Sequence, residues 1–283
     1  MKQKKGIGIL YIVAAALCFS LMTLFIRLAG DVPTIEKAFF RNAIAAIVAL
    51  VILGRSEEKF KIKKESYLFL FLRSSIGLAG VIANFWAIDH LVLSDANILN
   101  KMSPFFAIIM SVFILKEIPT RFEWGCVIAA FVGAVFVVKP TVGLASMPAF
   151  IGLASGFMAG TAYTFVRGLG KIGERSPVIV CFFSCFSTLV LGPMMAVQFQ
   201  PLTIKQLLLL ICCGLAATGG QFCITAAYTY APAKEISVFD YTQVIFAAMW
   251  GLLFFGELPD FYSYVGYAII IVTAVVKWRK GMK

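Results

Sequence analysis

The chain repeats itself at a constant offset of 140 residues. Arg27 corresponds to Arg167, and the segment 116–119 (Lys-Glu-Ile-Pro) corresponds to 256–259 (Gly-Glu-Leu-Pro) without a gap. If each half holds an odd number of membrane-spanning helices, the second half is inserted upside down relative to the first. Inverted repeats of this kind build membrane transporters, with the substrate site where the repeats meet. The repeat therefore restricts the chain to a small set of architectures.

The composition places the chain in a lipid bilayer. Hydrophobic residues make up 61% and charged residues 14% of its 283 residues, against roughly 25% charged in a typical soluble domain. Its mean hydropathy is +0.93. A soluble chain this apolar would expose large hydrophobic patches and aggregate. The sequence therefore predicts a multi-pass membrane protein.

Apolar runs between charged, Pro or Gly breaks give ten segments of a length that suits a bilayer core, which takes about 20 helical residues. We expect an all-α integral membrane protein with ten transmembrane helices in two inverted five-helix repeats, residues 1–140 and 141–283. The expected helices cover 7–29, 36–54, 67–89, 95–115, 121–139, 147–168, 177–197, 204–229, 235–255 and 261–278.

The distribution of Lys and Arg predicts the orientation, because these residues accumulate in cytoplasmic loops. With the N-terminus in the cytoplasm, most of the 25 Lys and Arg fall on cytoplasmic segments. The outer segments then hold Arg27, Lys37, Arg41, Lys139 and Lys205. We expect both termini to be cytoplasmic and the protein to reside in the inner (plasma) membrane. This asymmetry explains the net charge of +11, so no nucleic-acid partner is expected.

Polar residues gather on the expected helix 95–115. Asn97, Asn100, Lys101 and Pro104 follow a spacing that places them on one helix face. The repeat equivalent of Asn100 is Asp240, so two related helices are polar at the same depth. Such residues are costly inside a membrane and tend to face a cavity. Two readings stay open: Lys101 and Asp240 line a shared cavity, or they form a structural ion pair that locks the halves together.

Other polar and aromatic residues on the expected helices join this set because they lie on faces that could turn toward the same cavity. Two arginines are expected as gate or interface residues, namely Arg41 and Arg73. Arg73 lies about two turns from a basic loop, so it either reaches the substrate or extends to the lipid headgroups. The predicted substrate-binding residues are Asn84, Trp86, Asn97, Asn100, Lys101, Tyr163, Gln221, Asp240, Tyr241 and Gln243.

Motifs of catalysis and metal binding are missing from the sequence. No Walker loop, G-x-S-x-G turn or H-E-x-x-H helix occurs, and the single histidine and scattered cysteines offer no metal-ligand spacing. We therefore expect no enzyme activity, no metal and no cofactor.

In the segment Phe85–Val138 an acidic-Ala step, a Ser-Pro pair and a Glu-x-Pro turn follow one another in order. This order resembles the third to fifth helices of the EamA family, in the drug/metabolite transporter superfamily. The resemblance implies a ten-helix inverted-repeat carrier with a central cavity lined by the first, third, fourth, sixth, eighth and ninth helices. Members move amino acids and their analogues, nucleosides, riboflavin-like vitamins, S-adenosylmethionine or organic cations. The matching features are Phe40-Arg41, Asp95-Ala96, Ser103-Pro104, Glu117 and Pro119.

These observations predict a secondary transporter of small organic metabolites that works by alternating access across the inner membrane. An exporter or exchanger of amino-acid-like, zwitterionic or cationic solutes fits best, with Lys101 meeting an anionic group and Asp240 a cationic one. The alternatives are an uptake carrier for S-adenosylmethionine, a nucleoside or a vitamin and, more distantly, a channel or a structural membrane protein. The expected partners are a small-molecule substrate and the bilayer, with the protein as monomer or homodimer.

Overall fold

The computed structural model describes residues 2–58, 60–90, 99–138, 147–256 and 260–282. Within these ranges the chain forms helices and short connections, and contains no strand. The elements are α1 (Lys2–Ala29), α2 (Thr34–Arg55), the 3-10 helix η1 (Lys64–Ser66), α3 (Tyr67–His90), α5 (Ser103–Leu115), α6 (Arg121–Val138), α7 (Met147–Ile172), α8 (Ser176–Gln198), α9 (Ile204–Tyr230), α10 (Ala233–Asp240), α11 (Thr242–Phe255) and α12 (Phe261–Met282).

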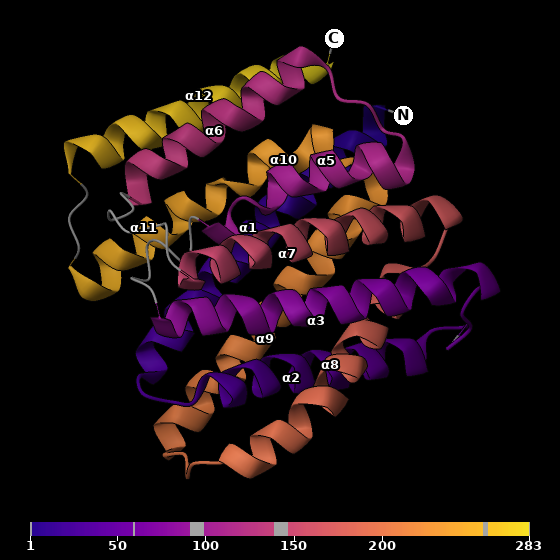
Figure 1. Cartoon of the computed structure of the whole chain (residues 1–283), viewed down its shortest axis with the longest axis vertical. Coiled ribbons are helices and arrows are strands. Elements are labelled where there is room, and N and C mark those ends of the chain that lie inside the picture. Colours follow the sequence, from indigo (N-terminus) through magenta and orange to yellow (C-terminus); the bar gives the residue numbers. More distant parts are fainter. Residues whose placement is uncertain (1, 59, 91–98, 139–146, 257–259, 283) are drawn as a thin grey trace.

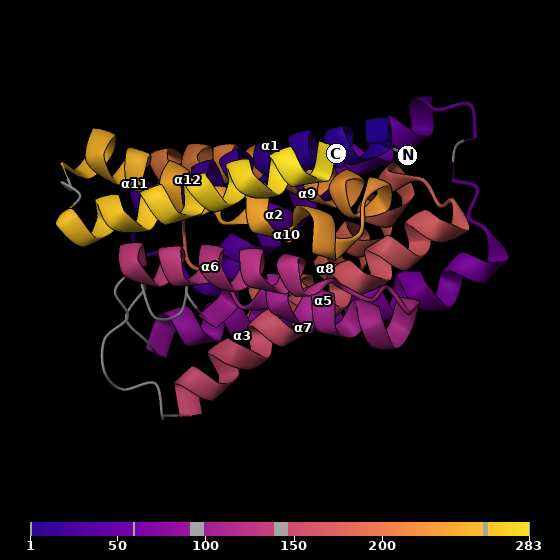
Figure 2. The ribbon, with the colours of Figure 1, turned by 90° about the horizontal axis from the view of Figure 1, so that it is seen from above.

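The length and hydropathy of these helices suit a membrane. Eight helical stretches of the described residues are long and apolar enough to cross a bilayer, and α5 is a shorter apolar helix. The all-helical membrane class is confirmed, whereas the count of ten spanning helices and the cytoplasmic termini stay predictions. Both ends of the chain lie at the same end of the helix bundle (Figures 1 and 2).

Helices of the first half pack mainly against helices of the second half. In Figure 1, α6 lies along α12 at one edge of the molecule, α2 lies beside α8 at the other, and α1, α3, α7 and α9 fill the centre. The central pairs are α1 with α9 and α3 with α7. A shift of 140 residues converts the first pair into the second, because α1 corresponds to α7 and α9 to α3. The packing therefore keeps the symmetry of the sequence.

Equivalent helices of the two halves run in opposite directions. The ring of Tyr11, near the start of α1, stacks on Tyr230 at the end of α9. Arg167, near the end of α7, donates a hydrogen bond of 3.1 Å to the backbone carbonyl of Thr229, also at the end of α9. The start of α1 and the end of α7 therefore lie at the same end of the bundle.

Two helices expected to be continuous are interrupted at equivalent positions. The expected helix 95–115 turns at Lys101 and Met102 before α5 begins, and the expected helix 235–255 turns at Tyr241 between α10 and α11. In the first case Pro104 lacks the N–H that the carbonyl of residue 100 would need. No proline lies near Tyr241, so a local sequence signal for the second interruption is missing.

Small residues on α7 allow close packing against the first interruption. A methyl group at Gly156 would lie 2.6 Å from the carbonyl oxygen of Leu99, and one at Gly160 would lie 2.5 Å from that of Ser103. Both distances are too short for a real side chain, so the backbone of α7 approaches the broken helix only because these residues are glycines. The close approach sets the wall of the cavity described next.

Candidate substrate-binding site

A cavity of about 440 Å³ lies between the two halves of the chain. Its inner part is formed by both helix interruptions, which contribute Asn100, Lys101 and Asp240. At its other end it reaches Gly30 and Asp31, two exposed residues of the connection between α1 and α2. Side chains of α1, α2, α3, α7, α8 and α9 complete the wall. This volume is within the range of cavities that enclose small organic ligands.

Seven of the ten predicted substrate-binding residues line this cavity, and two others, Trp86 and Tyr241, do not. Asn97 lies outside the described residues. Trp86 is 37% exposed, and its ring stacks on His90 with centroids 3.9 Å apart, away from the cavity. Tyr241 is fully buried in packing contacts. The cavity is lined by Asn84, Asn100, Lys101, Tyr163, Gln221, Asp240 and Gln243, together with Arg41 and Arg73.

The amine of Lys101 is held by two side chains of the second half. It lies 3.0 Å from Oδ2 of Asp240 and donates a hydrogen bond of 2.8 Å to Oε1 of Gln243. The exposed fractions of the Lys101 and Asp240 side chains are 14% and 8%. In this conformation the pair matches the structural ion-pair reading. Its charges cancel, so Lys101 contributes little net positive charge to the cavity.

Arg73 points into the cavity. Its side chain is 3% exposed, and the guanidinium lies over the ring of Phe183, 3.6 Å from the centroid. A methyl group at Gly77 would lie 2.9 Å from the Nη1 atom of Arg73. The guanidinium is therefore beside the next turn of α3, further from the basic connection that precedes this helix. Of the two roles left open by the sequence, extension to the headgroups does not match this geometry.

Several polar atoms on the cavity wall are buried without a hydrogen-bond partner. Two of them are the Nε atoms of Arg41 and Arg73, and the others are Oδ1 of Asn84 and Nε2 of Gln221. Buried polar groups of folded proteins are nearly always hydrogen-bonded, so a cluster of exceptions calls for an explanation. All four residues line the cavity, so a solute bound there would lie beside them.

Aromatic rings close one side of the cavity. Tyr163 stacks on Tyr228, with ring centroids 4.8 Å apart and an angle of 11° between the ring planes. Because Tyr228 is buried, it fixes the ring of Tyr163 at the cavity surface. The stacked pair gives a flat apolar wall that can support a planar or aliphatic part of a solute.

Sequence reasoning predicted Arg41 of α2 but missed Thr34 and Lys37 of the same helix and Phe183 of α8. Phe183 lines the cavity from α8, although the family resemblance implied a lining without the second and seventh helices. An apolar side chain on an apolar helix gives no signal in one sequence, because its neighbour across the cavity is unknown. Thr23 and Asp31, on α1 and the connection after it, were also missed.

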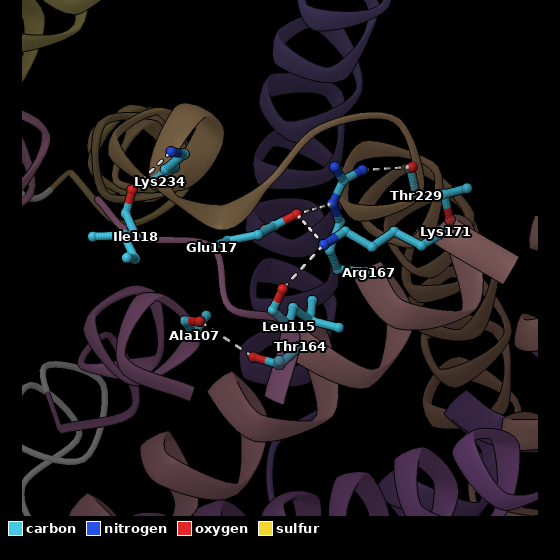
Figure 3. A network of polar contacts seen from close by, with 9 residues as sticks. All are labelled: Ala107, Leu115, Glu117, Ile118, Thr164, Arg167, Lys171, Thr229 and Lys234. Carbon is cyan, nitrogen blue, oxygen red and sulfur yellow. Dashed lines mark hydrogen bonds and ion pairs between the residues drawn. The ribbon is translucent and has the colours of Figure 1, made fainter. Parts of the chain in front are cut away.

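The opposite end of the bundle is closed by a polar network. Figure 3 shows Glu117, which follows α5, between two cations of α7: Nε of Arg167 lies 3.1 Å and Nζ of Lys171 lies 2.9 Å from its Oε1 atom. Arg167 also binds the carbonyl of Thr229 on α9. From α10, Lys234 donates a hydrogen bond of 2.9 Å to the carbonyl of Ile118. Connections from four helices are therefore joined at the end that holds both termini.

Comparisons with known proteins agree on one family. The sequence profile of the EamA-like transporter family matches residues 6–139 and 146–277. A pseudopaline exporter, CntI, of Pseudomonas aeruginosa strain UCBPP-PA14 is 32% identical over 279 residues, covering 97% of both chains. Human solute carrier family 35 member G1 is 25% identical, covering 98% of this chain and 81% of its own.

More distant similarities extend the same result. A riboflavin transporter of Rhizobium johnstonii is 25% identical over 98% of this chain and 92% of its own. One protein of known crystal structure superposes with a TM-score of 0.81 over 95% of both chains at 15% sequence identity. At that identity the superposition demonstrates a shared fold alone.

Proposed function

The chain belongs to the EamA-like transporter family, and on that premise we propose that it is a secondary carrier that moves a small organic metabolite by alternating access. The repeats, residues 1–140 and 141–283, would rock around the central cavity and expose it to one side of the membrane at a time. Carriers built from inverted repeats bind their substrates at interrupted helices near the midplane. The cavity between the interruptions at Lys101 and Tyr241 carries this proposal.

The two ends of the bundle support alternating access. The cavity reaches the connection between α1 and α2, whereas Glu117 and its partners join the helices at the other end. A carrier must be closed on one side while it is open on the other, and a few ion pairs suit a closure that must break in every cycle. A channel would need both ends open together.

An amino-acid-like solute fits the cavity better than a purely cationic one. The ion pair of Lys101 and Asp240 is internally neutral, whereas Arg41 and Arg73 add positive charge. A solute that bears a carboxylate would balance this charge, and an organic cation would be repelled by it. The side-chain amides of Asn84 and Gln221 can form hydrogen bonds with both the donor and the acceptor groups of a zwitterion.

We propose export or exchange across the inner membrane, with both termini in the cytoplasm. The Pseudomonas aeruginosa relative is named an exporter, and the Lys and Arg distribution favours a cytoplasmic position for the closed end. Uptake of a vitamin, a nucleoside or S-adenosylmethionine is the alternative, and the Rhizobium johnstonii relative is named a riboflavin transporter.

Counterflow in proteoliposomes tests the proposal. Vesicles with purified protein are loaded in turn with unlabelled amino acids, nucleosides, riboflavin or S-adenosylmethionine, and entry of the labelled solute is followed. A carrier gives a transient, saturable accumulation that depends on the internal solute. Flux without saturation or counterflow would identify a channel, and the absence of flux for every solute would favour a structural protein. The matched control is Arg175→Gln, which removes a cation paired with Glu58 outside the cavity.

A further inference from the structure

We infer that Arg41 and Arg73 form an anion-binding subsite, which holds an acid group, a carboxylate or a phosphate, of the transported solute. The inference rests on the proposed carrier function and names the substrate class for it. It also moves the anion contact away from Lys101, where the sequence placed it. Two helices supply the subsite, Arg41 from α2 and Arg73 from α3, and both residues line the same cavity.

The position of Arg73 is costly unless an anion binds there. A buried guanidinium loses its hydration, and the loss is normally repaid by a counter-ion and hydrogen bonds. The guanidinium of Arg73 lies 3.6 Å from the centroid of the Phe183 ring, and this cation–π contact offsets part of the lost hydration energy. The Nε atom of Arg73 has no hydrogen-bond partner. An arginine this close to the end of a helix could reach the headgroups instead. The absence of a methyl group at Gly77 leaves room for the inward conformation.

No acidic side chain of the described residues compensates the two arginines. Neither Arg41 nor Arg73 has an ion pair within the part of the chain that the structure describes, and the Nε atom of Arg41 is also buried without a partner. Asp240 is bound to Lys101 at 3.0 Å. The other acid on the cavity wall, Asp31, is exposed at the far end. The inner cavity is therefore positive where these arginines lie.

The chemistry of the donors selects an acid group. A guanidinium presents donors in a planar fork that matches the oxygens of a carboxylate or phosphate. Neutral hydroxyls and carbonyls would leave the positive charge unbalanced. The unpartnered amides of Asn84 and Gln221 line the same cavity and can hold the polar remainder of the solute. A zwitterion could place its acid end beside the two arginines and the rest of its polar groups beside the two amides.

Thermal unfolding in a neutral detergent at constant ionic strength tests the inference. The probes are citrate, glutamate and phosphoserine, each titrated against chloride, and glutaminamide is the matched compound without an acid group. The variants are Arg41→Gln, Arg73→Gln and the charge-retaining Arg73→Lys. Arg175→Gln removes the same charge from a site outside the cavity and is the control.

At least one acid is expected to raise the Tm of the wild-type protein in a saturable way, while glutaminamide does not. Arg41→Gln and Arg73→Gln should each weaken the binding of this acid by about tenfold or more, as expected for the loss of a charged hydrogen bond. Arg73→Lys should retain part of the effect, and Arg175→Gln all of it. The inference is overturned if no acid stabilises the wild type, or if the stabilisation persists in both Gln variants. Preference for phosphoserine over glutamate would assign the group as phosphate, and the reverse preference as carboxylate.

A second arm separates a solute from a lipid headgroup. Wild type and Arg73→Gln are compared in nanodiscs of phosphatidylcholine with and without phosphatidylglycerol. Stabilisation by phosphatidylglycerol that requires Arg73, without any effect of the soluble acids, would overturn the inference. Its failure is distinct from that of the carrier proposal. Counterflow of a solute without an acid group would support the carrier proposal and contradict the anion-binding subsite. Binding of an acid without any flux would support the subsite and contradict the carrier proposal.

Discussion

Tyr241 and Lys101 occupy equivalent positions of the two halves, and the Tyr241 hydroxyl donates a hydrogen bond of 3.0 Å to the backbone carbonyl oxygen of Lys101. Each residue lies at the interruption of its own helix. The N–H of Phe105, which would bind that carbonyl in a continuous helix, binds Met102 instead. The tyrosine therefore supplies the donor that the interruption removes, and the two interruptions are joined to each other at the inner end of the cavity.

Tyr241→Phe should destabilise the protein by about 1–3 kcal/mol, because the Lys101 carbonyl would be left buried without a donor. The measurement is thermal unfolding in detergent, with Tyr264→Phe as the control, since Tyr264 is exposed on α12. An equal Tm for Tyr241→Phe and wild type would show that water or another group replaces the hydroxyl.

Lys101→Met and Asp240→Asn should each cost about 3 kcal/mol, because each leaves one buried charge without its partner. The double variant should cost less than the sum, since it removes both charges. Unfolding of all four proteins forms a double-mutant cycle. Simple additivity of the two losses would mean that the 3.0 Å contact contributes no coupling.

Arg73→Gln should raise the Tm of the protein without ligand, by the equivalent of about 1 kcal/mol or more, because it removes a buried charge that lacks a counter-ion. The same variant should bind acids more weakly, so stability and binding would change in opposite directions. Unfolding with and without citrate measures both. A lower Tm without ligand would indicate that the cation contact with Phe183 outweighs the desolvation of the guanidinium.

Gly77→Ala should weaken acid binding without any change of charge. The added methyl group would lie 2.9 Å from Nη1 of Arg73 and must displace the guanidinium. Gly125→Ala is the matched control, because nothing lies within 4 Å of a methyl group there. The control should be neutral or stabilising by about 0.5–1 kcal/mol, as for alanine in place of glycine inside a helix. Equal acid affinities of the two variants would contradict the role given to Gly77.

Glu117→Gln should loosen the closed end of the bundle, because the Oε1 atom would lose its charge toward Arg167 and Lys171. Accessibility is read by maleimide labelling of a cysteine placed at Thr164, a buried position beneath this network (Figure 3), in a background without other cysteines. Labelling should become faster than in the parent. Glu58→Gln, on an exposed ion pair, should leave the rate unchanged.

The polar residues of the cavity illustrate how far one sequence predicts a site. Asn100 and Asp240 were identified because polar groups at equivalent depths of two repeats indicate a shared cavity, and both line it. Trp86 was predicted because it lies on a helix face that could turn toward the same cavity, but its ring stacks on His90 and lies outside the cavity. Which face of a helix turns inward depends on all its neighbours, and periodicity is a weak guide on helices that are apolar all round.

The sequence by itself determined the all-helical membrane class and the family, because hydropathy and the 140-residue repeat are properties of residues along the chain. Tertiary structure alone decided three other features: the partner of Lys101, the inward direction of Arg73 and the interruption at Tyr241. Each feature involves atoms from another helix. Lys101 contacts Asp240 and Gln243, Arg73 contacts Phe183, and Tyr241 contacts the carbonyl of Lys101. A buried charge or an unpaired carbonyl has no preferred partner in the sequence; only packing of the two halves brings one within hydrogen-bond distance.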